Sequence, residues 1–163
     1  MTTESKVAQT LQGFGVQFEM IDCDPDFADT AEFCEKYGYP PDHSANTILV
    51  ASKRGPKKHA ACVVLATTRL DVNHTVRDLM DVRRLSFASP EETAEVTGMM
   101  LGGVTPLNLP PGLPVYVDAR IMRLEYVILG GGSRSAKIKV DPDVFNRLPG
   151  VQVIEGLANE FPA

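Results

Sequence analysis

The chain has 163 residues, which is the size of a single domain. Hydrophobic residues make up 44% and charged residues 23% of it, proportions that exclude a disordered chain, a coiled-coil rod and a disulfide-stapled miniprotein. The net charge of -5 disfavours a general nucleic-acid binder. We therefore expect one globular domain over residues 1–163.

Residue spacing and capping residues predict the elements of the first half. Apolar residues recur at helical spacing or alternate as in a strand. Thr30 is a suitable cap for a helix that Gly38 ends. Two β-branched runs flank a turn that contains Gly55 and Pro56, which indicates a hairpin. The predicted elements are helices over 5–13 and 30–37 and strands over 16–21, 47–51 and 60–66.

Short helices and short strands alternate in the second half. Ser89 and Pro90 form a good helix start, because serine caps, proline suits the first helical position, and acids follow in the first turn. A long irregular stretch begins at Gly102. The predicted elements are helices over 71–80, 90–97 and 142–148 and strands over 84–88, 115–117, 126–129, 136–140 and 151–154. This order predicts an α/β or α+β domain with a mixed or mainly antiparallel sheet.

The sequence has the features of a cytoplasmic protein. No stretch approaches the ~20 apolar residues of a membrane span, and the first residues lead into an amphipathic pattern instead of a signal peptide. Three cysteines, Cys23, Cys34 and Cys62, are an odd number without C-x-x-C spacing, which indicates reduced thiols. We expect a cytoplasmic location and no membrane partner.

The charges are unevenly distributed along the chain. Residues 1–50 carry two basic and nine acidic side chains, whereas residues 51–163 carry 14 basic and 12 acidic ones. A basic cluster can hold one end of an RNA even on an acidic protein, but a solvated hairpin tip is the simpler explanation. The cluster consists of Lys53, Arg54, Lys57, Lys58 and His59.

Signatures of the common enzyme classes do not occur in the sequence. His43, His59 and His74 lack metal-ligand spacing, so we expect no metal site, and no cofactor is indicated. The G-x-S-x-G and Walker A motifs are missing. Cys62 lies within a strand pattern, where a buried and inert thiol is expected.

Two glycine-rich segments remain as candidate binding loops. In 102–106, adjacent glycines allow a ligand to approach the backbone N–H groups, and Pro106 stiffens the loop. In 130–135, Ser133 and Arg134 add donors suited to a phosphate or a ribose. Ordinary turn chemistry explains both loops as well, because Gly-Gly commonly reverses a chain.

The G-x-x-x-P loop from Gly102 to Pro106 is followed by Pro-Val-Tyr-Val-Asp at 114–118. Together with 45–50, 62–66 and the segment 128–140, this order resembles the YbaK-like aminoacyl-tRNA deacylases, a family related to the editing domain of bacterial prolyl-tRNA synthetases. The resemblance covers about residues 45–142.

The resemblance implies a single compact domain with a mixed sheet curled toward a barrel and helices outside. It implies hydrolysis of the ester of a mischarged tRNA in a pocket for the aminoacyl group and the terminal adenosine. The implied partners are the tRNA acceptor end with its amino acid and an aminoacyl-tRNA synthetase, but not DNA. The implied substrate-binding residues are Thr47, Gly102, Gly103, Val104, Thr105, Pro106, Gly131, Gly132, Ser133 and Arg134.

The sequence departs from the family pattern at Asn46. Family members usually carry a lysine there, directly before the threonine, and that lysine matters for activity. An amide donates hydrogen bonds without charge, and the loss of a charged contact can cost on the order of a hundredfold in rate. Lys53, Arg134 and Lys137 are candidate replacements. A histidine in the second glycine loop is also missing.

Two hypotheses follow. The first is a freestanding trans-editing deacylase in which Asn46 is the candidate catalytic residue, the 102–106 backbone positions ester and water, and Arg134 holds the acceptor end. An aminoacyl ester is already activated, so a positioned water and donors for the oxyanion can suffice. The alternative is a hydrolysis-deficient module that binds an aminoacyl-adenosine or a tRNA end. Hydrolysis of a small ester other than aminoacyl-tRNA is a third possible activity. The sequence does not indicate which amino acid would be removed.

Overall fold

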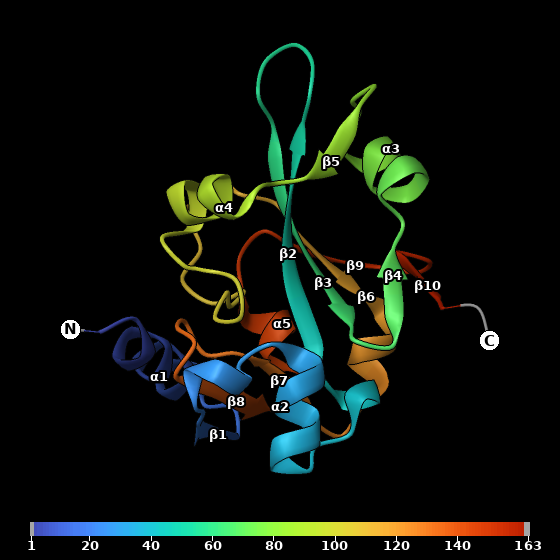
Figure 1. The fold of residues 1–163 in the computed structure, drawn as a ribbon. Helices are drawn as coiled ribbons and strands as arrows, with labels where there is room; N and C mark the ends of the chain where they lie inside the picture. Colours follow the sequence, from blue (N-terminus) through green and yellow to red (C-terminus); the bar gives the residue numbers. More distant parts are fainter. Residues whose placement is uncertain (1, 162–163) are drawn as a thin grey trace.

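Three sheets built from ten strands form the framework of the computed structural model, which describes residues 2–161 (Figure 1). One sheet has the order β1-β8-β7, a second β5-β2-β3-β6-β9, and β4 pairs with β10. The strands are β1 (Phe18–Asp22), β2 (Ala45–Ser52), β3 (His59–Leu65), β4 (Thr68–Leu70), β5 (Leu85–Phe87), β6 (Val115–Asp118), β7 (Val127–Gly130), β8 (Ala136–Val140), β9 (Val151–Ile154) and β10 (Ala158–Glu160).

Five of the seven strand pairings are antiparallel, and only β3–β6 and β6–β9 are parallel among the described residues. The mixed, mainly antiparallel sheet predicted from the sequence is therefore confirmed. The strands do not close into a barrel, because a single parallel bridge, Ser44 to Ile128, connects the two larger sheets.

The helices lie on the outside of these sheets, as expected. They are α1 (Thr3–Phe14), α2 (Thr30–Tyr37), α3 (Arg77–Met80), α4 (Pro90–Thr97) and α5 (Val144–Arg147), with 3₁₀ turns at 25–27, 41–43 and 119–123. The predicted helix over 71–80 is a π-helical turn, Val72–Val76, that continues into α3, and Asp71 caps it by accepting from the Thr75 N–H.

The cap of α2 differs from the prediction. Asp29 has the extended backbone of an N-cap residue, with φ -66° and ψ 144°, and Thr30 is the first helical residue. The hydroxyl of Thr30 is therefore free to bond elsewhere. Ser89 caps α4 as predicted, with its Oγ accepting from the Glu92 N–H at 3.0 Å.

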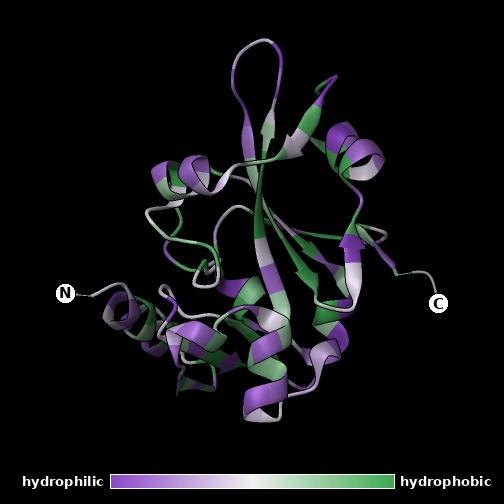
Figure 2. Cartoon of the chain, viewed as in Figure 1, coloured by the Kyte–Doolittle hydropathy of each residue, from purple (hydrophilic) through white to green (hydrophobic). Residues whose placement is uncertain are grey.

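The β2–β3 hairpin lies between two hydrophobic cores. Successive β3 residues alternate between them, so that Val63 packs on the α1 and α5 side while Cys62 and Val64 pack on the α3 side. Figure 2 shows the hydrophobic strands at the centre and a hydrophilic hairpin tip. The basic side chains Lys53 and Arg54 at that tip are exposed.

A third cluster places α2 against the β1-β8-β7 sheet (Figure 1). Phe33 and Cys34 of α2 pack with Ile128 of β7 and Cys23 beyond β1. The bridge from Ser44 to Ile128 holds the start of β2 beside this sheet. As a result α2, the first residues of β2 and the central strand β8 meet in one place.

No helix of the described chain is both long and apolar enough to cross a membrane.

Candidate functional site

A cavity of about 310 Å³ opens where α2, β2, β7, β8 and the irregular loop after α4 meet. Its lining combines small apolar side chains with a few polar groups. The lining residues are Asp29, Thr30, Ala45, Asn46, Thr47, Ile48, Leu101, Gly102, Val104, Gly130 and Lys137. Convergent polar groups in a cavity of this kind mark a candidate binding site for a small ligand.

The glycines of the two loops allow the loops to pack against each other. A Cβ on Gly103 would overlap the backbone of Ser133, and a Cβ on Gly130 would overlap the Val104 carbonyl. Gly102 has φ +88°, and its Cβ would overlap the Arg134 guanidinium. The sequence suggested that these glycines admit a ligand to the backbone, but here they admit a neighbouring chain segment.

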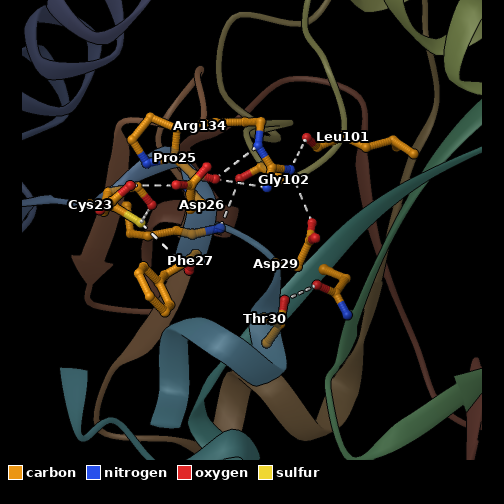
Figure 3. Close-up of polar contacts among 12 residues, drawn as sticks. Cys23, Pro25, Asp26, Phe27, Asp29, Thr30, Leu101, Gly102 and Arg134 are labelled. Carbon is orange, nitrogen blue, oxygen red and sulfur yellow. Dashed lines mark hydrogen bonds and ion pairs between the residues drawn. The ribbon is translucent and has the colours of Figure 1, made fainter. Parts of the chain in front are cut away.

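Arg134 fastens the cavity loop to the segment before α2 (Figure 3). Its Nη1 donates to the Leu101 carbonyl at 2.9 Å and to Asp29 Oδ1 at 3.0 Å. Its Nη2 and Nε donate to the Pro25 carbonyl at 2.8 and 3.2 Å. The guanidinium is thus engaged within the protein, and Arg134 does not line the cavity.

Asn46 and Thr47 face the cavity at the start of β2. The Thr30 hydroxyl donates to Asn46 Oδ1 at 2.5 Å, so the amide group of Asn46 is held by the first turn of α2. The side-chain nitrogen of Asn46 makes no hydrogen bond within residues 2–161. Thr47 is buried, and its hydroxyl has no hydrogen-bond partner among the described residues.

Lys137 of β8 is the cation that the structure places in the cavity. The residue is 6% exposed, and its Nζ donates to the Gly102 carbonyl at 2.8 Å. Burial lowers the pKa of its ammonium group, and the nearby Cys23 and Asp29 offset part of this shift. Of the other two candidate cations, Lys53 is at the hairpin tip and Arg134 is engaged as described above.

A second cavity of about 510 Å³ adjoins the same two residues, Thr30 and Asn46. Tyr39 lines it and stacks on Phe33 at 5.5 Å between ring centroids. Its lining also includes Ala31, Cys34, Glu35, Pro41 and Ala66. The two cavities share Thr30 and Asn46, so a ligand with two parts can reach both.

Two of the three cysteines, Cys23 and Cys62, are buried and do not line either cavity. Cys62 is fully buried in the hairpin, and burial raises the pKa of its thiol to about 12. Burial also raises the pKa of Cys23. Within the described range, no three His, Cys, Asp or Glu side chains are grouped to hold a metal ion.

Residues 24–148 match the family model of the aminoacyl-tRNA editing domain. The chain belongs to this family. The matched segment contains the cavity and both glycine loops, and the family resemblance that the sequence motifs suggested is confirmed.

Solved structures share the fold of this editing domain. A protein proposed to be a trans-editing enzyme for prolyl-tRNA synthetase superposes with a TM-score of 0.80 at 24% identity, and the match covers 99% of both chains. The hypothetical protein APE2540 gives a TM-score of 0.82 at 24% identity over 94% of this chain and 99% of its own. In a proposed signal transduction protein from Marinobacter aquaeolei VT8, the fold covers 30% of the chain, with a TM-score of 0.61 and 19% identity over 94% of this chain.

The editing domain brings only some of the sequence-predicted residues to the cavity. Asn46, Thr47, Gly102 and Val104 line it. Three other predicted residues have different roles. The buried Thr105 hydroxyl accepts a hydrogen bond from the Leu107 N–H, and Pro106 lines a separate cavity. The Ser133 hydroxyl donates a hydrogen bond to Glu4. The Gly132 N–H joins the two loops by donating to the Gly103 carbonyl, whereas the Gly131 N–H donates to Ala136 within its own turn. None of these three glycines lines the cavity.

Sequence analysis did not include Thr30 or Tyr39 in the site and left Lys137 as one of three cations. A lysine in a strand that alternates as Ala-Lys-Ile-Lys-Val is normally assigned to solvent. Lys137 differs from Lys139 in its burial because of the position of α2 over the sheet. That position depends on tertiary packing and cannot be read from the strand pattern.

Proposed function

We propose that this protein hydrolyses the ester bond of mischarged aminoacyl-tRNA in the 310 Å³ cavity, as a freestanding enzyme that acts in trans. One observation carries the proposal. Several polar groups that make few hydrogen bonds within the protein line the same cavity, and this cavity lies in the segment that matches the editing family. A protein of the same fold that is proposed to edit for prolyl-tRNA synthetase supports a tRNA substrate and a synthetase as partner.

In this proposal the two cavities divide the substrate between them. The smaller cavity receives the amino-acid side chain, because Ala45, Val104 and Gly130 leave room for a small group. The larger cavity receives the terminal adenosine, with Tyr39 as the aromatic surface beside the base. Asn46 lies between them, where the ester joins the two parts of the substrate.

The chemistry requires a positioned water and donors for the developing oxyanion. Gly102 and Val104 line the cavity, and their N–H groups make no hydrogen bond within residues 2–161; we assign them as donors to an ester oxygen. Asn46 offers its side-chain nitrogen, and Thr47 offers its unpartnered hydroxyl. Preorganised donors of this kind commonly account for a factor of about 10²–10³ each in acyl-transfer enzymes.

Arg134 and the 131–133 turn act indirectly in this proposal. Arg134 holds Leu101 and Gly102 in place by its bond to the Leu101 carbonyl, and the turn supports the same loop through the bond from the Gly132 N–H to the Gly103 carbonyl at 2.8 Å. Both therefore shape the cavity and do not touch the amino acid.

The test is deacylation of a panel of mischarged tRNAs, including cysteinyl-, alanyl- and seryl-tRNA species, by the purified protein. We expect a rate above spontaneous hydrolysis that rises in proportion to protein concentration, with the smallest amino acids hydrolysed fastest. No acceleration on any member would refute the enzyme. If the folded protein then still bound tRNA or an aminoacyl-adenosine analogue, it would be a binding module.

A further inference from the structure

Lys137 is a buried cation that is only partly satisfied. An ammonium group has three N–H donors, and the one hydrogen bond that Lys137 makes in the described structure goes to a neutral acceptor, the Gly102 carbonyl. No carboxylate of residues 2–161 lies within ion-pair distance of it. Burying an unpaired charge costs free energy. If Lys137 served only to hold the Gly102 loop by a hydrogen bond, an uncharged donor would do so at a lower cost in stability.

The surroundings of Lys137 do not neutralise its charge. The carboxylate whose charge acts on Lys137 is that of Asp29, but the Asp29 Oδ1 atom already binds Arg134 at 3.0 Å. Cys23 and Cys34 also face it, and the Phe33 ring centroid lies 5.7 Å from Nζ. Two cations thus share one carboxylate, which leaves positive charge beside the cavity.

The position of this charge suits a reacting ester. Lys137 lines the same cavity as Asn46, Thr47 and Val104, and its hydrogen bond to Gly102 directs the ammonium toward the loop that carries the free N–H groups. Asn46 alone supplies no charge to this cavity. The positive charge in the cavity lining therefore comes from Lys137 of β8 and not from the start of β2.

We propose that the Lys137 ammonium binds the carbonyl oxygen of the aminoacyl ester and stabilises the oxyanion formed during hydrolysis. This inference rests on the proposed function. Water adds to the carbonyl carbon, the bond from that carbon to the ribose oxygen breaks, and a proton from the water passes to the ribose oxygen. Lys137 keeps its protons throughout, and its hydrogen bond to Gly102 fixes its position.

The first test replaces Lys137 by methionine, which keeps the length of the side chain and removes the charge. We expect Lys137→Met to lower kcat on the order of 10²-fold or more on the best tRNA of the panel, because a charge that acts in the transition state is lost. KM should change only a few-fold. The melting temperature should stay equal or rise, because an unpaired buried charge has been removed.

The matched control is Lys139→Met, two residues along the same strand. Lys139 is half-buried, lies 4.6 Å from the Tyr126 ring centroid, and lines a different cavity. We expect its kcat to equal that of the wild type. If Lys137→Met lowered the melting temperature and its loss of activity matched the unfolded fraction, Lys137 would be a structural residue and the proposal would be wrong.

The second test is the pH profile of kcat, which remains informative if the methionine variant folds poorly. Because burial lowers the pKa of Lys137, the enzyme-dependent rate of the wild type should fall at a lower pH than an exposed lysine would titrate. Lys137→Arg stays charged and should lose this alkaline decline while it keeps part of the activity. An identical decline in both proteins would overturn the proposal.

The outcomes separate the two claims. A wild type that hydrolyses no member of the panel refutes the proposed function, and the role of Lys137 falls with it. A wild type that is active together with an equally active and folded Lys137→Met refutes the role of Lys137 alone.

Discussion

Thr47 carries an unusual feature at the scale of single residues, because its buried hydroxyl has no partner in the described structure. Such a group is normally satisfied, and one left unpaired costs about 1–3 kcal/mol. It lines the proposed site, and a hydroxyl held ready for a substrate oxygen explains why it is retained. The unpaired Thr47 hydroxyl thus lowers the free energy of unfolding but provides a hydrogen-bonding group for the substrate.

Thr47→Val should therefore raise the free energy of unfolding by about 1 kcal/mol, since valine has the same shape and no polar atom. Urea denaturation measures the change. Thr68→Val is the matched control: the Thr68 hydroxyl is also buried but donates to the Leu65 carbonyl at 2.8 Å, so its loss should cost about 1 kcal/mol. Equal destabilisation by both variants would show that the Thr47 hydroxyl is satisfied in solution.

Single residues of the site were the hardest to predict from sequence. Thr47, Gly102 and Val104 could be predicted as cavity residues because they lie in the family motifs, and Asn46 because it occupies the position of the family lysine. The burial of Lys137 could not, because it requires the Ser44–Ile128 bridge and the packing of α2 on the sheet. A side chain's exposure depends on the neighbouring layer, which the residue's own strand pattern does not specify.

At the scale of elements, the two glycine loops form one unit. The Gly132 N–H donates to the Gly103 carbonyl, and a side chain on Gly130 would overlap the Val104 carbonyl. The cavity therefore depends on backbone packing between 102–104 and 130–133. Substitutions there should act on stability as well as on activity.

Gly130→Ala should lower the free energy of unfolding by about 2 kcal/mol, because the added methyl group forces the two backbones apart. Gly13→Ala is the control: Gly13 lies within α1 with no atom near its Cβ position, so alanine should raise stability by about 0.5–1 kcal/mol. Chemical denaturation of the two variants gives both values. A neutral Gly130→Ala would mean that the loops are not in close contact.

Elements with strong local signals were predicted well. Helix α4 has a serine cap, a proline and an ending glycine, and the β2–β3 hairpin has β-branched runs around a turn. Strands β4 and β10 were missed, because each has three residues and β10 reads Ala-Asn-Glu, which has little strand propensity. Among residues 2–161 they pair only with each other, and this pairing exists only once the chain has folded.

At the scale of the whole molecule, the proposed function depends on surfaces that meet from distant parts of the sequence. The site combines α2, the start of β2, the loop after α4 and strand β8, all within the segment that matches the editing family. The overall α/β class and the mixed sheet could be predicted from the order of elements. The openness of the sheet could not, because closure depends on strand tilt and register.

The central claim is that deacylation takes place in the cavity beside Lys137. Leu101 is 48% exposed at the rim of this cavity, whereas its neighbour Met100 is 58% exposed and does not line it. A tryptophan at 101 should obstruct the mouth, and a tryptophan at 100 should not. Neither exposed position should affect stability by more than about 0.5 kcal/mol.

The most direct measurement is single-turnover deacylation of the best mischarged tRNA by the wild type, Leu101→Trp and Met100→Trp, each with its melting curve. We predict at least a tenfold lower rate for Leu101→Trp and a wild-type rate for Met100→Trp, with equal melting temperatures. Equal rates for all three folded proteins would contradict the account and place the reaction elsewhere on the molecule.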